Sequence, residues 1–312
     1  MNAAVAVVFI VLAADTALAS SFDDDAKALV GSDQSERAMA QKRLHEGGAD
    51  AIGALVRGLD DPRREARIRY IETIKEIERS KKKVTPKDSD ISELARRARL
   101  EPNPGMRRYL LSPLRQSRGA TALKELERFA TEDPDESIRS EATHYSGELS
   151  SGETAFFKKI AATDPSPYVR LAAYLELTAT GDASGRAEAL RVIASSKKDY
   201  ERHDAIWILG EIGNPEDVAI LTPIAASSTE NYEVRNVAHQ ALKSIELKQY
   251  PAIARLSFLI KSLDDPDALV RDWAYLKLWK CPDPLTNVRL RAYLIEPGHK
   301  GYKEAADALS LR

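Results

Sequence analysis

Apolar residues recur along this chain at intervals of three and four, in short segments that polar turns separate. This spacing is typical of one face of an α-helix. It is clearest in residues 252–263, where the apolar positions are Ile253, Leu256, Leu259, Ile260 and Leu263. A second segment of the same kind follows in residues 266–280. No segment sustains the period-two alternation of a half-buried strand, so the pattern predicts an all-α protein.

This two-helix pattern repeats along the chain. The second segment of each copy has an apolar residue, then an arginine, then a small residue three positions later, as in VRDWA, VRNVA, VRLAA and IRSEA. With weaker copies included, the repeated arginines are Arg37, Arg67, Arg107, Arg139, Arg170, Arg202, Arg235 and Arg271. They are separated by 30, 40, 32, 31, 32, 33 and 36 residues. A near-constant step of this size predicts a solenoid of stacked repeats.

Aspartate–proline pairs stand between the two helices of a repeat, at residues 61–62, 133–134, 164–165 and 265–266. An aspartate at the N-cap accepts a hydrogen bond from a free amide, and a proline at the first helical position loses no hydrogen bond. We therefore predict that the second helices begin at these prolines. On this interpretation the Asp264-Asp265-Pro266 stretch is a helix start and not an acidic active site.

The array resembles the HEAT-repeat family, most closely its short-repeat branch, which is also found in phycocyanobilin lyases. DDPDALVRDWA, DPSPYVRLAA and ERHDAIWILGEIGNPEDVAIL carry the resemblance, which extends from about Ser21 to the C-terminus. It implies a right-handed α-solenoid of about eight two-helix repeats. It also implies a structural ladder of hydrogen bonds between neighbouring repeats, made by the turn aspartates and the repeated arginines: Asp133 and Arg139, Asp164 and Arg170, Asp265 and Arg271.

The N-terminus differs from the rest of the chain. Ala3 to Ala14 are twelve uncharged apolar or small residues, and a small-x-small site ends at Ala19. This pattern predicts a signal peptide over residues 1–19 and a periplasmic or secreted protein without stable membrane insertion after cleavage. A retained N-terminal anchor is the alternative. Residues 20–312 are predicted to be one HEAT-repeat array, with a loop insertion at 80–90 and a capping helix at 300–312.

Composition excludes some functions. The 46 basic and 48 acidic residues give a formal charge of −2, which lacks the excess of cations expected of a nucleic-acid-binding protein. Cys281 is the only cysteine, so no disulfide can form within the chain. Nothing in the sequence indicates a cofactor.

The second helices are expected to line the concave face of the solenoid. Positions one, four, five and eight after each repeated arginine point away from the predicted core. Aromatic and histidine side chains at these positions are the candidates for binding a protein or peptide partner. They are His144, Tyr174, Trp207, His239, Tyr275 and Trp279. The alternative is that these side chains are buried against the neighbouring repeat.

No phosphate-binding loop, metalloprotease motif or hydrolase nucleophile motif is present. His144, His203 and His239 on successive second helices are the best metal-binding candidates, so an unrecognised metal-binding protein or enzyme centred on His203 is the alternative function. Deoxyhypusine hydroxylases are HEAT-repeat enzymes with His-Glu pairs on several repeats. Here only His203-Asp204 stands in an equivalent place on a second helix, and His45-Glu46 lies in a degenerate repeat. The sequence thus predicts a scaffold without metal or catalytic residues, and not an enzyme.

Overall fold

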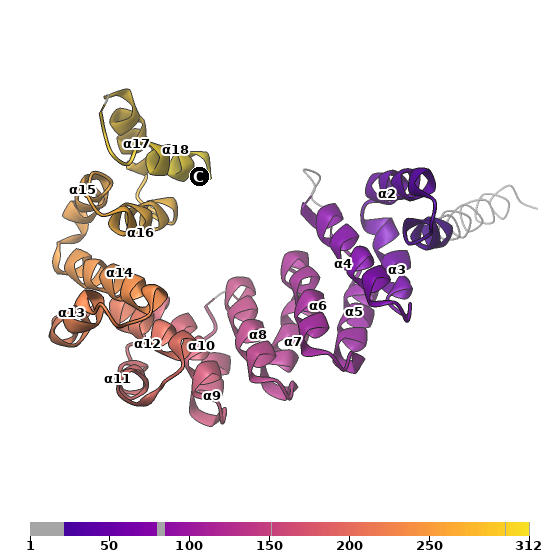
Figure 1. The fold of residues 1–312 in the computed structure, drawn as a ribbon, viewed down its shortest axis with the longest axis horizontal. Helices are drawn as coiled ribbons and strands as arrows, with labels where there is room; N and C mark the ends of the chain where they lie inside the picture. Colours follow the sequence, from indigo (N-terminus) through magenta and orange to yellow (C-terminus); the bar gives the residue numbers. More distant parts are fainter. Residues whose placement is uncertain (1–21, 80–84, 151, 297, 312) are drawn as a thin grey trace, which may run out of the picture. The chain divides into compact units, whose positions relative to one another are not determined.

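The computed structural model describes residues 22–79, 85–150, 152–296 and 298–311, and within them the chain forms helices joined by short turns and loops, with no strand (Figure 1). The predicted signal peptide lies outside them. Residues 22–29 form the first described helix. The helices that follow are α2 (Gln34–Gly47), α3 (Ala49–Gly58), α4 (Arg64–Arg79), α5 (Asp88–Leu100), α6 (Pro104–Ser117), α7 (Ala120–Glu132), α8 (Glu136–Leu149), α9 (Ala155–Thr163), α10 (Pro167–Thr178), α11 (Arg186–Ser195), α12 (Asp199–Ile212), the 3-10 turn η1 (Pro215–Asp217), α13 (Val218–Ala226), α14 (Tyr232–Gln249), α15 (Ala252–Ser262), α16 (Ala268–Trp279), α17 (Thr286–Ile295) and α18 (Tyr302–Ser310).

The chain divides into two compact units, residues 1–153 and residues 154–312. Within each unit consecutive helices pack as pairs, from α3 with α4 to α7 with α8 in the first unit and from α9 with α10 to α17 with α18 in the second. The second helices of the second unit, α10, α12, α14, α16 and α18, also pack one against the next. The all-α repeat architecture is therefore confirmed.

Two boundaries differ from the predicted ones. The loop expected at 80–90 ends earlier, because α5 begins at Asp88, while residues 80–84 lie outside the described part of the chain. The C-terminal helix covers Tyr302–Ser310. It packs with α17 and with α16, so it is the second helix of a further pair, which the arginine pattern did not include.

The second helices begin two residues later than predicted. Helix α16 starts at Ala268, and its N-cap is Asp267, whose carboxylate accepts from the Leu269 amide at 3.0 Å. Asp265 instead forms a turn by accepting from the Asp267 amide at 2.9 Å. The same offset occurs at α8 and α10, where Asp135 and Ser166 are the N-cap residues. The aspartate–proline pair thus makes the turn that leads into the helix.

Most of the repeated arginines tie this turn to their own helix. Arg271 donates from Nη1 to the carbonyls of Asp265 (2.9 Å) and Pro266 (3.2 Å), and its Nε reaches Glu304 of the next pair at 3.3 Å. Arg170 likewise binds the carbonyls of its turn and then Glu188, 2.7 Å away. The predicted ladder is thereby corrected, because the acceptor in the arginine's own repeat is the aspartate carbonyl and not its carboxylate.

The turn carboxylate does take the predicted inter-repeat role at Asp133. Its two oxygens accept from Arg107 of the preceding repeat at 2.9 and 3.0 Å, and both side chains are buried. Arg139 binds the carbonyl of Asp133 at 2.9 Å, as Arg170 and Arg271 do in their turns. One buried aspartate therefore joins two repeats within the first unit.

The predicted core positions of α14 are confirmed. Val234, Ala238, Ala241 and Ile245 are all at most 3% exposed. Helices α12 and α14 approach closely at Gly210, where a Cβ would lie 2.7 Å from the Ala241 Cα. Such an approach requires glycine, and it places the outer side chains of these two helices next to each other.

Candidate functional site

One row of side chains lies on the free side of the second helices. It consists of the residue five positions after each repeated arginine, about 140° around the helix from it, and is called the Arg+5 row here. In the second unit the row contains Leu175, Trp207, Gln240 and Leu276, from α10, α12, α14 and α16. Trp207 is 36% exposed, and the other three are half-buried. The row is mainly apolar, and Trp207 is its exposed member, whereas Leu175 packs against the core cluster of the central repeats.

Trp207 is held beside a histidine. His203, one turn earlier on α12, has its ring centroid 6.1 Å from that of Trp207. The His203 Nδ1 lies 3.0 Å from an Asp204 carboxylate oxygen, which fixes the orientation of the imidazole ring. Within the described part of the chain, the Trp207 indole N–H has no hydrogen-bond acceptor. A ligand at this position could therefore gain both apolar contact and a hydrogen bond.

Trp279 is 37% exposed, near the end of α16. Its indole N–H donates to the Leu311 carbonyl at 3.3 Å, and the Lys280 ammonium lies 5.7 Å from the ring centroid. Tyr275, one turn earlier, is half-buried against the C-terminal core cluster. The tryptophan is thus accessible, whereas the tyrosine mainly supports packing.

Tyr174 resembles Tyr275 in this respect. It is half-buried and packs against the core cluster of the central repeats, and burial raises its pKa. A Cβ at Gly185 would lie 2.8 Å from the Tyr174 Cβ, so the loop before α11 lies directly on the tyrosine. Tyr174 and Tyr275 both stand four positions after a repeated arginine, where the side chain faces the next repeat.

The predicted histidines lie in different places. His144 is half-buried on α8 of the first unit, and His239 is half-buried on α14 of the second unit. Across residues 22–79, 85–150, 152–296 and 298–311, no group of three or more histidine, cysteine, aspartate or glutamate side chains could hold a metal ion. His203 is paired with Asp204, as described above, so what it contributes here is the environment of Trp207.

An ion pair spans α14 in the second unit. Lys277 on α16 binds Glu211 on α12 directly, although α14 packs between these helices. The long lysine side chain thus joins two second helices that are not neighbours.

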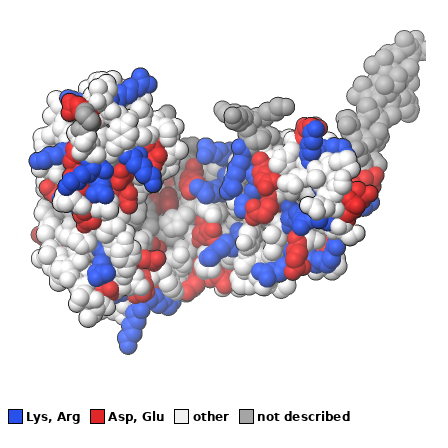
Figure 2. All heavy atoms as spheres, turned by 45° about the horizontal axis from the view of Figure 1, so that its top comes forward, with Lys and Arg blue, Asp and Glu red and all other residues white. Residues whose placement is uncertain are grey.

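The corresponding face of the first unit carries ion pairs between helices. His45 lies 3.0 Å from Glu76, and Arg108 lies 2.7 Å from Glu141. Arg115 binds Glu148 and stands 4.9 Å from the Tyr145 ring centroid. Acidic and basic side chains are also interspersed on the visible surface in Figure 2. The charges of this face mostly satisfy one another, unlike the apolar row of the second unit.

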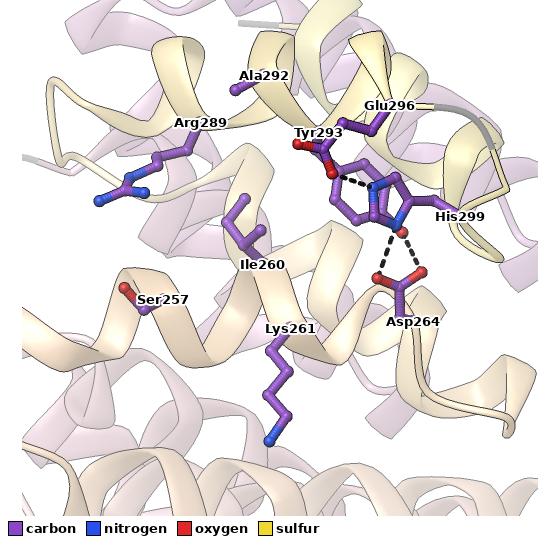
Figure 3. A pocket seen from close by; sticks show the side chains of 9 residues that line it. All are labelled: Ser257, Ile260, Lys261, Asp264, Arg289, Ala292, Tyr293, Glu296 and His299. Carbon is purple, nitrogen blue, oxygen red and sulfur yellow. Dashed lines mark hydrogen bonds and ion pairs between the residues drawn. The ribbon is translucent and has the colours of Figure 1, made fainter.

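A pocket of about 330 Å³ lies between α15 and α17 in the second unit (Figure 3). At one end, the Asp264 carboxylate accepts from the Tyr293 hydroxyl (2.8 Å), the Lys300 amide (3.1 Å) and His299 Nδ1 (2.9 Å). The imidazole of His299 stacks on the Tyr293 ring with centroids 3.9 Å apart. The other lining residues are Ser257, Ile260, Lys261, Arg289, Ala292 and Glu296.

The hydrogen bonds control ionisation at this end of the pocket. Burial favours the protonated form of Asp264, but the donors from Tyr293, Lys300 and His299 outweigh it and hold the pKa below its usual value. Burial and the same carboxylate raise the Tyr293 pKa. Sequence reasoning missed this cluster and assigned Asp264 to a helix start. The detectable signal was spacing, since Asp264 and His299 follow the first helices of successive pairs, 35 positions apart.

These features define a helical-repeat protein built from stacked helix pairs. More particularly, residues 154–243 match the family model for HEAT repeats, which confirms the resemblance predicted from the sequence. No curated protein matches the chain. Among solved structures, the chain is similar to human deoxyhypusine hydroxylase in complex with glycerol, at 18% identity, 90% coverage of this chain, 98% coverage of that chain and a TM-score of 0.33.

That similarity corrects the prediction that the protein is not an enzyme. The prediction rested on the absence of familiar motifs, and such an absence excludes no activity. At this identity and TM-score the similarity assigns no reaction to the present chain. Function has to be argued from the chain's own residues.

Among the described residues, none of the helices combines the length and the apolar character that crossing a bilayer requires.

Proposed function

We propose that the second unit is a protein-interaction module that binds a segment of a partner protein on its Arg+5 row. The observation that carries this proposal is the exposure of Trp207, at 36%, in a row that continues through the half-buried Gln240 on α14 to Leu276 on α16. HEAT repeats form helical scaffolds of the kind that commonly serve interactions. Trp279, 37% exposed near the end of α16, is a second accessible tryptophan of the same unit.

The energetics favour a partner with an apolar side chain at the centre of the contact. Tryptophan is enriched among the residues that dominate protein interfaces, and truncating such a residue costs about 2 kcal/mol or more. The free indole N–H of Trp207 adds direction, because a backbone carbonyl of the partner can accept from it. An extended peptide offers such carbonyls, and the Arg+5 row across α12, α14 and α16 would hold it.

We further propose that this module acts outside the cytoplasm. The support is the apolar segment from Ala3 to Ala14 and the small residues that end at Ala19. Mass spectrometry of the protein recovered from its own host tests this directly. A mature N-terminus at Ser20 is expected, whereas retention of Met1 would contradict cleavage.

The binding proposal is tested by affinity capture from the host's envelope fraction, quantified by mass spectrometry. Wild type is compared with Trp207→Ala and with Tyr302→Ala, which removes a more exposed aromatic residue (53%) at the start of α18. We expect at least one protein that wild type and Tyr302→Ala recover equally and that Trp207→Ala loses. If no recovered protein depends on Trp207, the Arg+5 row is not the binding surface.

A further inference from the structure

The pocket between α15 and α17 lies on the first helices of the last two pairs, whereas the Arg+5 row lies on the second helices. It therefore requires an explanation of its own. The pocket is lined by the basic residues Lys261 and Arg289 and by the acidic residues Asp264 and Glu296. Whether it prefers an anion or a cation therefore depends on which of these charges already have a partner in the protein.

One of the two carboxylates of the pocket is satisfied from within the protein. Asp264 receives three hydrogen bonds, from Tyr293, His299 and the Lys300 amide. Glu296 is exposed and places an oxygen 3.6 Å from His299 Nε2, so the imidazole lies between the two acids. Figure 3 shows the contacts of His299 with both acids, and of Tyr293 with Asp264, at one end of the pocket. The Asp264 carboxylate therefore has little remaining capacity to attract a cation.

The cations of the pocket are not satisfied in this way. Among the described residues, the side chains of Lys261 and Arg289 make no ion pair or hydrogen bond. Both side chains are exposed, so a ligand can reach them without displacing a partner. The Ser257 hydroxyl, one turn before Lys261 on α15, is also available. Figure 3 places Ser257 and Arg289 at the end opposite His299, on facing helices.

We propose that this pocket binds a small organic anion, a carboxylate or a phosphate ester, through Arg289, Lys261 and Ser257. The guanidinium of arginine matches the geometry of both anions and carries its charge at every physiological pH. Between the two polar ends, Ile260 and Ala292 line the pocket and offer apolar contact to the body of the ligand. The volume of about 330 Å³ fits a ligand of roughly one ring plus its charged group.

The experiment uses the full chain and three matched probes: benzoate, phenyl phosphate and the neutral benzyl alcohol. Affinities are measured by ligand-observed NMR titration at low salt, where the attraction between exposed charges is least screened. Arg289→Gln removes the charge that lines the pocket. Arg291→Gln is the control, because it removes the same charge from an exposed position of the same helix that does not line the pocket. Circular dichroism checks that both variants keep the wild-type fold.

We expect at least one of the two anions to bind at millimolar concentration or below. Arg289→Gln should weaken that binding at least about tenfold, the loss typical of one hydrogen-bonded charge. Arg291→Gln should change it less than about twofold. A preference for benzoate assigns a carboxylate ligand, and a preference for phenyl phosphate assigns a phosphate.

Three results would overturn the proposal. Equal losses in the two variants would mean diffuse attraction to a basic helix. Equal affinity for benzyl alcohol and benzoate would mean a merely apolar pocket. No binding of either anion at millimolar concentration would mean that the pocket is not an anion site. The proposal is independent of the Arg+5 row, so each can fail without the other.

Discussion

The buried carboxyl of Glu78 makes the first unit sensitive to pH. Glu78 is near the end of α4, where its Oε1 accepts from the Ser117 hydroxyl on α6 at 3.0 Å. Its Oε2 is enclosed and has no hydrogen-bond partner among the described residues. Burial raises the pKa from 4.5 to about 8, against the smaller opposing effects of Ser117 and Arg79. At neutral pH the folded protein therefore holds a proton that the unfolded chain releases.

The sign and size of the effect follow from linkage. A carboxyl with a raised pKa in the folded state lowers the free energy of unfolding as pH rises between 4.5 and about 8. Each pKa unit corresponds to about 1.4 kcal/mol, so above this range the ionised Glu78 lowers the free energy of unfolding by about 5 kcal/mol in total. Between pH 5 and pH 8.5 the expected loss is about 4 kcal/mol. Glu78→Gln keeps the shape and removes the ionisation.

The assay is urea unfolding of the full chain, followed by circular dichroism at several pH values between 5 and 8.5. The free energy of unfolding of Glu78→Gln should exceed that of wild type by an amount that grows by about 4 kcal/mol over this range. Glu65→Gln, at an exposed position on the same helix, is the control and should follow wild type at every pH. If the difference between Glu78→Gln and wild type stays constant within about 1 kcal/mol, the carboxyl does not titrate as described.

Three further predictions concern packing and charge. Arg107→Met leaves the buried Asp133 carboxylate without its ion-pair partner. It should lower the free energy of unfolding, measured in urea, by about 3–5 kcal/mol. As a control, Arg115→Met breaks the exposed Arg115–Glu148 pair and should lower the free energy of unfolding by less than about 1 kcal/mol. Gly210→Ala should lower the free energy of unfolding by about 1–3 kcal/mol despite the better helix propensity of alanine, because the new methyl group would meet the Ala241 Cα at 2.7 Å; a rise in melting temperature would contradict this. Asp264→Asn should loosen the turn around His299, and the amide of Lys300 should then exchange faster than in wild type. This difference from wild type should shrink as pH falls. The pKa of Asp264 is lowered in the folded protein, so the stability that its carboxylate contributes is present above the usual aspartate pKa and is lost in acid.

The helix pairs could be predicted from sequence because helical periodicity is local. Apolar residues such as Val234 and Ile245 recur at the spacing of one helix face, and the repeated arginines mark each second helix. The helix starts were placed two residues early. The carboxylate of Asp265 satisfies the amide two positions later, and this turn geometry cannot be distinguished from an N-cap by composition alone.

The surface was harder to predict, because the exposure of a side chain depends on what the neighbouring repeat places against it. Leu175 and Leu276 hold the same position as Trp207, yet they are half-buried whereas Trp207 is exposed. The cluster of Asp264 and His299 joins residues from two repeats. Local sequence patterns do not report such contacts, so it was missed.

The measurement that tests the central proposal most directly is site-specific photo-crosslinking in the native host. A photoreactive phenylalanine derivative is placed at position 207 in one variant and at position 302 in another, both exposed aromatic sites of the second unit. A discrete crosslinked protein from position 207, and none from position 302, is the predicted result. Crosslinks that are absent at position 207, or the same at both positions, would contradict the assignment of the Arg+5 row as the binding surface.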